Sequence, residues 1–288
     1  MTGIAIVDKP AGWTSHDVVA KLRRALGERR IGHGGTLDPM ATGVLPVFVG
    51  RATRAASFLE SADKEYLASV RFGLVTDTQD TTGQVLSESG LCPGEGEIEA
   101  ALKGFLGPQE QLPPLYSAVK VDGRKLYQYA RAGREVERQP RRIEISAIEP
   151  LGFGTEGDYR FRLTVSKGTY VRTVCHDLGQ RLGCGGAMSA LRRLRAGAFP
   201  IEEASPLEAF LAEDGAALLR PLDSIFRAYP PLTLAEEETR RVRCGNDFPT
   251  AAQAGIYRLY DASGEFLALA EAAEGRMKTI KNFFEVSI

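Results

Sequence analysis

Apolar and polar residues alternate along several short segments of the chain, as expected for strands that bury one face. The alternation is clearest at residues 159–165 and also marks residues 66–72 and 143–147. A mainly apolar run at residues 3–7 predicts another strand. Near the C-terminus, two apolar segments flank a turn at residues 261–264 and predict a β-hairpin.

Three further segments carry apolar residues at helical spacing, three to four positions apart. The first begins at a cap formed by Thr14 or Ser15 and stops at Gly27, and the others cover residues 98–106 and 171–182. Strands and helices therefore mix irregularly, without the strict alternation of a parallel doubly wound sheet. We expect an α+β fold around a mainly antiparallel sheet.

A break in the pattern divides the chain near residue 228, where the sequence reads Ala-Tyr-Pro-Pro. The predicted hairpin lies beyond this break, in sequence of a different texture. We therefore predict a large domain over residues 1–228 and a small β-rich domain over residues 229–288.

The composition is that of an ordinary globular protein, with 43% hydrophobic and 25% charged residues among 288. The N-terminus has no signal-peptide pattern, and nowhere do about 18 apolar residues run together. We expect a cytoplasmic protein that does not enter a membrane. The four cysteines form no CxxC pair and there are only three histidines, so we expect reduced thiols and no metal site.

Charge is unevenly distributed although the net charge is only −1. Residues 120–142 hold eight basic residues against Asp122, Glu135 and Glu137, and the rest of the chain is richer in acids. This segregation favours a phosphate-facing surface, and solvated helix faces are the alternative. The basic residues of this segment are Lys120, Arg124, Lys125, Arg131, Arg134, Arg138, Arg141 and Arg142, and a second cluster consists of Arg192, Arg193 and Arg195.

The segment GHGGTLDPMATGVLP, residues 32–46, isolates one carboxylate in small and apolar surroundings. Between Arg30 and Arg51, Asp38 is the only acid and His33 the only other ionisable side chain. We predict a loop here, in which glycines let a ligand approach the backbone closely. A turn aspartate that caps its own backbone is the alternative reading of Asp38.

Three other polar positions are candidates for a site. Arg172 lies at the margin of its helix's buried face, where it can pair with a buried acid or remain in solvent. Tyr66 is a core tyrosine unless an active site lies at its end of the strand. Asp77 and Asp80, in TDTQDTTG, lack the spacing of a calcium loop and indicate a polar turn.

Taken together, five ordered segments resemble the bacterial tRNA pseudouridine-55 synthases, the TruB-like family. These segments are VDKPAGWTSHDVV, GHGGTLDPMATGVLP, DKEYLASVRFG with TDTQDTTG, PPLYSAVKVDGRKLYQYAR, and SKGTYVRTVCHDLG followed by LRRLRAG. The similarity covers residues 4 to about 197. His176 stands where an acidic residue is frequent in the family.

The resemblance implies a pseudouridine synthase catalytic domain, followed by a PUA-like RNA-binding domain. It also implies that a T-loop uridine of tRNA, at position 55, is flipped into a pocket and isomerised. The N-glycosidic bond breaks, the uracil turns, and C5 is rejoined to C1′. No group enters or leaves, so the reaction implies no cofactor and no metal. The implied partner is tRNA, and we expect a monomer.

The resemblance also assigns roles to single residues. Asp38 matches the essential aspartate, Tyr66 the active-site tyrosine, and Arg172 the arginine that pairs with the aspartate. The other implied contacts are Leu191 beside the pocket, Lys9 and Pro10 under the catalytic loop, His33 near the displaced base, and an RNA-gripping insertion at about 120–142 with Lys120, Arg124, Arg131, Arg134, Arg138 and Arg141.

Two other classes of function remain open. A non-catalytic RNA chaperone would use the same basic surface but leave uridine unmodified. A carboxylate-dependent glycoside or nucleoside hydrolase would release free base and would need a second acid, which the segment around Asp38 does not supply.

Overall fold

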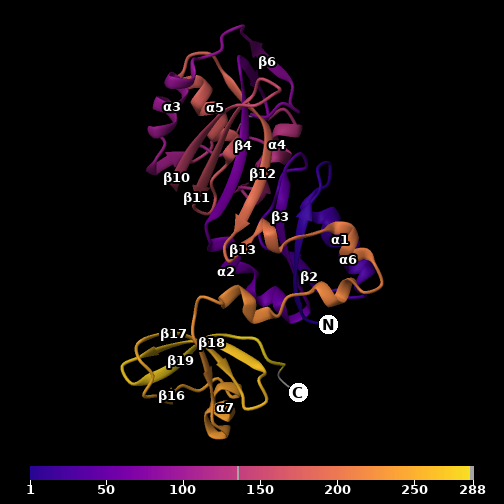
Figure 1. Cartoon of the computed structure of the whole chain (residues 1–288), viewed down its shortest axis with the longest axis vertical. Helices are drawn as coiled ribbons and strands as arrows, with labels where there is room; N and C mark the ends of the chain where they lie inside the picture. Colours follow the sequence, from indigo (N-terminus) through magenta and orange to yellow (C-terminus); the bar gives the residue numbers. More distant parts are fainter. Residues whose placement is uncertain (135, 286–288) are drawn as a thin grey trace.

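The computed structural model describes residues 1–134 and 136–285. Glu135, one of the acids in the basic segment, and residues 286–288 of the predicted second domain lie outside the described residues. The described chain forms a larger part built on a ten-stranded sheet and a smaller part built on a five-stranded sheet. The larger part lies above the smaller one in Figure 1.

The larger sheet has ten strands and is mainly antiparallel, as the sequence predicts. The parallel pairs are β1 with β14 and β3 with β12. In spatial order the strands are β14 (Ser205–Pro206), β1 (Gly3–Lys9), β3 (Thr42–Val49), β12 (Gly186–Ala196), β4 (Lys64–Phe72), β11 (Tyr159–Val165), β10 (Arg141–Phe153) and β7 (Gly107–Gln111), with β13 (Phe199–Pro200) beside β12 and β2 (Ile31–His33) beside β3.

Burial explains why some strands alternate in sequence and others do not. In β11, every second residue is buried, because one face packs on the core and the other faces solvent. Strand β1 is buried on both faces: Ala5 and Val7 join one apolar cluster, and Ile4 and Ile6 join another. A strand between two cores reads as a continuous apolar run.

Helices cover the sheet and connect its strands. The first, α1, begins at the Thr14 cap, whose hydroxyl accepts a hydrogen bond from the Asp17 amide while the Asp17 carboxylate accepts one from the Thr14 amide. Within the described residues, no helix is long and apolar enough to cross a membrane. The helices are α1 (Ser15–Ala25), α2 (Ala56–Ser61), α3 (Glu95–Lys103), α4 (Leu126–Arg131), α5 (Val171–Arg181), α6 (Leu207–Leu211) and α7 (Glu236–Arg243), with short 3₁₀ turns η1 (Gly50–Ala55), η2 (Ile201–Glu203), η3 (Gly215–Leu218) and η4 (Leu222–Phe226).

The predicted loop over residues 32–46 is only partly a loop. Its first residues end β2 and its last residues begin β3, so that irregular backbone is confined to residues 34–41. The prediction was wrong because β3 is buried on both faces and therefore shows no alternation. The helix predicted over residues 98–106 begins and ends three residues earlier, as α3.

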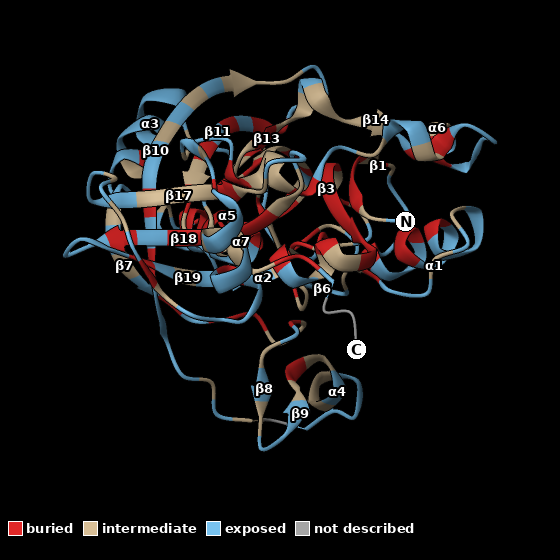
Figure 2. Cartoon of the chain, turned by 90° about the horizontal axis from the view of Figure 1, so that it is seen from below, coloured by how far each residue is buried: buried red, intermediate tan, exposed pale blue. Residues whose placement is uncertain are grey.

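The basic segment projects from the sheet between β7 and β10. It contains a small hairpin of β8 (Lys120–Val121) and β9 (Arg124–Lys125), followed by α4. Figure 2 shows these three elements standing apart from the body of the protein. A second small hairpin, β5 (Leu74–Thr76) with β6 (Val85–Glu88), lies at the far end of the same part.

The C-terminal part is β-rich, and the predicted hairpin is its β17–β18 pair. It contacts the larger part through an apolar cluster that includes Phe226 and Phe283. Asp223, just before the junction, accepts a hydrogen bond of 2.5 Å from the Tyr260 hydroxyl. The strands in spatial order are β15 (Pro231–Thr233), β17 (Gly255–Tyr260), β18 (Phe266–Ala273), β19 (Arg276–Asn282) and β16 (Phe248–Pro249).

Candidate active site

Asp38 lies in the short turn between β2 and β3, and α1 braces this turn. The Ser15 hydroxyl accepts a hydrogen bond of 2.9 Å from the Leu37 amide and donates one of 3.2 Å to the Leu37 carbonyl. On the other side of Asp38, the Gly12 amide donates to the Pro39 carbonyl at 2.8 Å. The residues on either side of the carboxylate are therefore tied to the first helix and the turn before it.

Lys9 supports the same turn from the end of β1. Its buried ammonium donates to the carbonyls of Pro10, Trp13 and Pro39 at 2.8, 2.7 and 3.3 Å. Burial lowers the pKa of Lys9 to about 8, and nearby Asp38 opposes that shift. The residues predicted to support the catalytic loop, Lys9 and the half-buried Pro10, thus lie directly beside it.

Asp38 and Arg172 form an ion pair. Arg172 Nε lies 2.9 Å from Asp38 Oδ2, and Nη2 donates to Oδ1 at 3.3 Å. Arg172 is only 5% exposed, whereas the Asp38 side chain is 33% exposed and can be reached from solvent. Burial raises the pKa of the Asp38 carboxyl, and the Arg172 guanidinium acts against that rise.

Arg172 is held on its other side by the TDTQDTTG turn. Its Nη1 lies 3.5 Å from Asp80 Oδ2 and donates to the Thr78 carbonyl at 3.0 Å, and Nη2 donates to the Tyr116 carbonyl at 3.0 Å. Asp80 Oδ1 in turn accepts hydrogen bonds from the Thr82 amide and hydroxyl at 3.0 and 2.5 Å. Interpreting these residues as a polar turn therefore missed a buried partner of Arg172.

The sequence signal for this partner was weak. Arg172 was expected at the margin of the buried face of α5, and it proves fully buried because Asp38 and Asp80 supply carboxylates on two sides. The threonines that flank Asp80 are the one local hint, because the hydroxyls of Thr78 and Thr82 donate hydrogen bonds that satisfy a buried carboxylate.

Tyr66 and Leu191 form an apolar wall within the buried cluster that also contains sequence neighbours of the ion pair. Tyr66 on β4 and Leu191 on β12 lie on neighbouring strands, two positions apart in register, and both are buried. They share one apolar cluster with Leu37, next to Asp38, and with Val171, next to Arg172. The structure thus places the predicted tyrosine and leucine in the same cluster as the neighbours of the charged pair.

His33 ends β2 and is neutral near pH 7. Burial lowers the pKa of His33 to about 4, and proximity to His16 contributes to the shift. The two imidazole rings meet edge to face with 5.3 Å between their centroids. A neutral imidazole can both donate and accept hydrogen bonds at the entrance to the Asp38 turn.

The second basic cluster is not a phosphate-facing surface as predicted. Arg193 is 1% exposed and points into the protein. Arg192 and Arg195 are half-buried and are paired with Asp8 at 2.7 Å and with Glu65 at 3.5 Å. The prediction failed because these acids are distant in sequence, and only the folded sheet brings them to the arginines.

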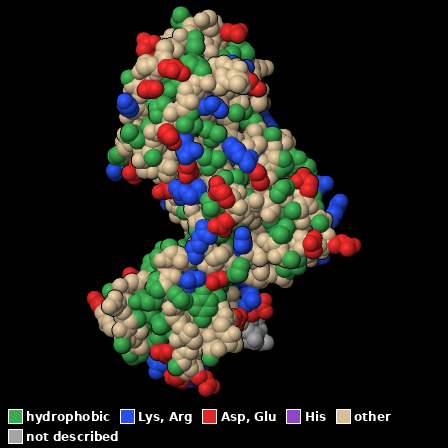
Figure 3. Space-filling view, viewed as in Figure 1, with side chains coloured by type: hydrophobic (Ala, Val, Ile, Leu, Met, Phe, Trp, Pro, Cys, Tyr) green, Lys and Arg blue, Asp and Glu red, His purple; other side chains and the backbone are tan. Residues whose placement is uncertain are grey.

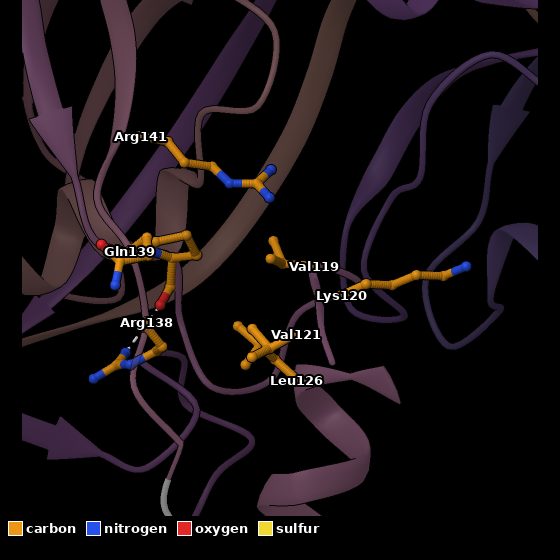
Figure 4. Close-up of a pocket in the computed structure, with 8 residues that line it drawn as sticks. Val119, Lys120, Val121, Leu126, Arg138, Gln139 and Arg141 are labelled. Atoms are coloured by element: carbon orange, nitrogen blue, oxygen red, sulfur yellow. Dashed lines mark hydrogen bonds between the residues drawn. The ribbon is translucent and has the colours of Figure 1, made fainter. Parts of the chain in front are cut away.

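The cations of residues 120–142 lie mainly in solvent. Arg138 is half-buried and donates to the Pro113 carbonyl at 2.9 Å, which ties the last part of the segment to the chain that leads into it. Beside it is a cavity of about 110 Å³, into which Figure 4 shows Val119, Val121 and Leu126 pointing while Lys120 extends away. The predicted cations that are exposed are Lys120, Arg124, Arg131, Arg134, Arg141 and Arg142.

Figure 3 shows Lys and Arg side chains along the middle of the face in view, interspersed with acids. Within the described residues, no three His, Cys, Asp or Glu side chains gather as metal ligands would. The four cysteines form no disulfide among the described residues.

The arrangement provides one carboxylate that is oriented by a buried arginine and bordered by apolar side chains. Such a carboxylate can act as a nucleophile, stabilise positive charge on a sugar, or accept a proton. Each of these roles requires an ionised and fixed Asp38. The ion pair with Arg172 favours the ionised form, and the hydrogen bonds of Ser15 with Leu37 and of Lys9 with Pro39 fix the backbone on either side.

Comparison with known proteins identifies the family. Residues 23–171 match the N-terminal domain of the TruB family pseudouridylate synthases. Residues 172–227 match the tRNA pseudouridylate synthase B C-terminal domain, and residues 229–284 match the C-terminal region of tRNA pseudouridine synthase II.

Curated relatives and solved structures agree with this match. Proteins named tRNA pseudouridine synthase B are similar over most of their length: that of Opitutus terrae is 49% identical over 81% of this chain and 96% of the relative, and that of Synechococcus elongatus is 45% identical over 96% of each. The structure of a Cbf5–Nop10–Gar1 complex covers 98% of this chain and 85% of its own, with 29% identity and a TM-score of 0.74. An H/ACA ribonucleoprotein bound to a substrate RNA is also similar, with 26% identity, the same 98% and 85% coverage, and a TM-score of 0.73.

Proposed function

This chain belongs to the TruB family, whose members isomerise uridine to pseudouridine in tRNA, and we propose that it acts on the T-loop uridine at position 55. The N1–C1′ bond of that uridine breaks, the uracil turns, and C5 bonds to C1′. The proton on C5 is lost and N1 gains one, so the reaction is an isomerisation that consumes nothing. The observation that carries the proposal is the Asp38–Arg172 ion pair.

Asp38 is the catalytic carboxylate in this proposal. It is accessible enough to meet the substrate, and Arg172 holds it ionised beside the glycosidic bond. The contacts of Arg172 with Asp80 and two carbonyls fix its guanidinium, so that the ion pair has one orientation. A fixed charge of this kind favours the transition state because it needs no rearrangement during the reaction.

The apolar wall receives the flipped base. Removing a uridine from its stack costs a few kcal/mol, which contacts with Tyr66 and Leu191 partly offset. Neutral His33 offers a hydrogen bond to the displaced base without adding charge.

The projecting segment grips the RNA backbone. Its exposed cations supply affinity through phosphates without reading sequence, and Lys120 and Arg141 lie at its two ends. We propose further that residues 1–228 are the catalytic domain and residues 229–288 a PUA-like RNA-binding domain. In this proposal the enzyme works as a cytoplasmic monomer without a cofactor or metal.

The test is product analysis on an unmodified tRNA transcript, with Asp38→Asn and a matched control, Asp214→Asn, whose carboxylate is exposed. The wild-type chain and the control form pseudouridine at position 55, and Asp38→Asn forms none while its tRNA affinity stays within a few-fold. Tight binding without modified uridine in the wild type indicates an RNA chaperone instead. Release of free uracil indicates a hydrolase.

A further inference from the structure

Arg193 is the largest side chain among the fully buried residues of the described chain. It lies on β12, opposite Gly43 of β3 on one side and Tyr66 of β4 on the other. Arginine is almost never fully buried unless its donors are satisfied. The hydrogen-bond acceptors of the Arg193 guanidinium therefore indicate the role of this buried charge.

The three hydrogen bonds that the Arg193 side chain donates all go to backbone carbonyls on the two arms of the Asp38 turn. Nε donates to Val44 at 2.7 Å, Nη2 to Gly35 at 3.2 Å and Nη1 to Thr36 at 3.5 Å. Within the described residues, no carboxylate lies within ion-pair distance of this guanidinium. The interactions of Arg193 are thus directed at the backbone before and after Asp38.

The backbone of Arg193 is also held close to the strand that follows the Asp38 turn. Gly43 has φ of +99°, and a Cβ at this position would lie 2.2 Å from the Arg193 carbonyl oxygen and 2.7 Å from its amide nitrogen. Only glycine allows β3 to approach β12 so closely. The close approach brings the turn within reach of the guanidinium.

We propose that Arg193 is a positioning residue that clamps both arms of the Asp38 turn against β12 and so sets where the carboxylate meets the substrate. This inference rests on the proposed function, because Asp38 must be the catalytic group for its position to matter. The α1 contacts hold the turn from one side and Arg193 holds it from the sheet. A shift of about 1 Å in a reacting group can cost about 100-fold in rate.

Lys64 provides a matched control. It is also buried on the same sheet, and its ammonium also donates to three carbonyls, at 3.1, 2.7 and 2.6 Å. Those carbonyls belong to Leu59, Glu60 and Ala62, in and after α2, and not to the Asp38 turn. Lys64→Met therefore removes a buried cation close to Arg193 without removing a hydrogen bond to the Asp38 turn.

The experiment compares full-length wild type, Arg193→Met, Arg193→Lys and Lys64→Met on a tRNA transcript, at a temperature where circular dichroism shows each to be folded. We expect Arg193→Met to lower kcat by about 10- to 100-fold with KM within about threefold, because the carboxylate is misplaced while RNA contacts remain. Arg193→Lys recovers part of kcat, since an ammonium can hold one arm but not both. Lys64→Met lowers the unfolding temperature but keeps kcat within about threefold.

Wild-type kcat in folded Arg193→Met overturns the proposal, and so does an equal loss of kcat in Lys64→Met. If Arg193→Met does not fold, Arg193→Lys decides: a changed KM with unchanged kcat overturns the proposal, and a lowered kcat with unchanged KM supports it. A wild-type chain that forms no pseudouridine overturns the proposed function together with this inference, whereas an active wild type with an unaffected Arg193→Met overturns this inference alone.

Discussion

Truncating Arg172 tests whether the buried charge network determines both stability and rate. Arg172→Met removes the cation from Asp38 and Asp80 and the donors from two carbonyls. Asp80 is then left buried without a compensating charge. Breaking a buried pair in this way costs about 3–5 kcal/mol, which for a domain of this size lowers the unfolding temperature by roughly 6–20 °C.

Arg243 is a control with the same number of carboxylate partners but in solvent. It lies 3.1 Å from Asp261 and 2.8 Å from Glu265, and its side chain is 41% exposed. Exposed ion pairs contribute about 0–1 kcal/mol, so Arg243→Met is expected to lower the unfolding temperature by less than about 4 °C. Both variants are compared by thermal unfolding and by kcat at saturating tRNA.

Arg172→Met is also expected to lose rate at saturation, because Asp38 loses its orienting partner, whereas Arg243→Met keeps kcat. Two results would refute the reasoning. One is an unfolding temperature for Arg172→Met no lower than that of Arg243→Met. The other is a wild-type kcat in Arg172→Met, which would show that the ion pair does not orient a reacting group.

Three further predictions concern pH, RNA contacts and metals. Burial raises the pKa of Asp38, so kcat should fall on acidification at a pH above the ordinary range for aspartate. Arg172→Lys, by weakening the contact with Asp38, should move this acidic fall in kcat to higher pH. A fall in kcat only below the ordinary aspartate range would contradict the prediction. Neutralising Arg131, Arg134, Arg138 and Arg141 should weaken binding to all competent tRNAs. The slope of log binding constant against log salt concentration should become shallower by about 0.7–0.9 per lost phosphate contact. An unchanged slope would show that these arginines only face solvent. Turnover should continue in excess chelator. A loss of turnover that one specific metal ion restores would contradict the proposal that the isomerisation needs no metal.

The fold could be predicted from the sequence where burial is one-sided. Strand β11 and the β17–β18 hairpin alternate in sequence as they do in burial, and the mainly antiparallel sheet followed from them. Strand β3 could not be predicted in this way, because a strand buried on both faces has no alternation to detect. The glycines of residues 32–46 favoured a loop over that whole segment, but β2 and β3 take up its two ends.

The candidate site was partly predictable for a related reason. The isolation of Asp38 is a local feature, and the proposed pairing with Arg172 is present in the structure, while the catalytic roles of both remain predictions. The roles of Arg193 and Asp80 could not be predicted from the sequence, because their contacts are with residues far away along the chain. The cluster Arg192, Arg193 and Arg195 has the same sequence whether Arg193 faces phosphates or binds the backbone of a turn.

The strand order also bears on how the chain folds as it is synthesised. Strands β3 and β4 follow each other in sequence, yet β12, made more than a hundred residues later, lies between them. A chain that ends before α5 therefore holds Asp38 but neither Arg172 nor Arg193, which contact Asp38 and its turn. It also leaves the edges of β3 and β4 that face β12 unpaired. Unpaired edges attract other chains, and long-range pairing is slow to form. The emerging protein should thus remain inactive and in need of protection until nearly the whole first sheet has left the ribosome.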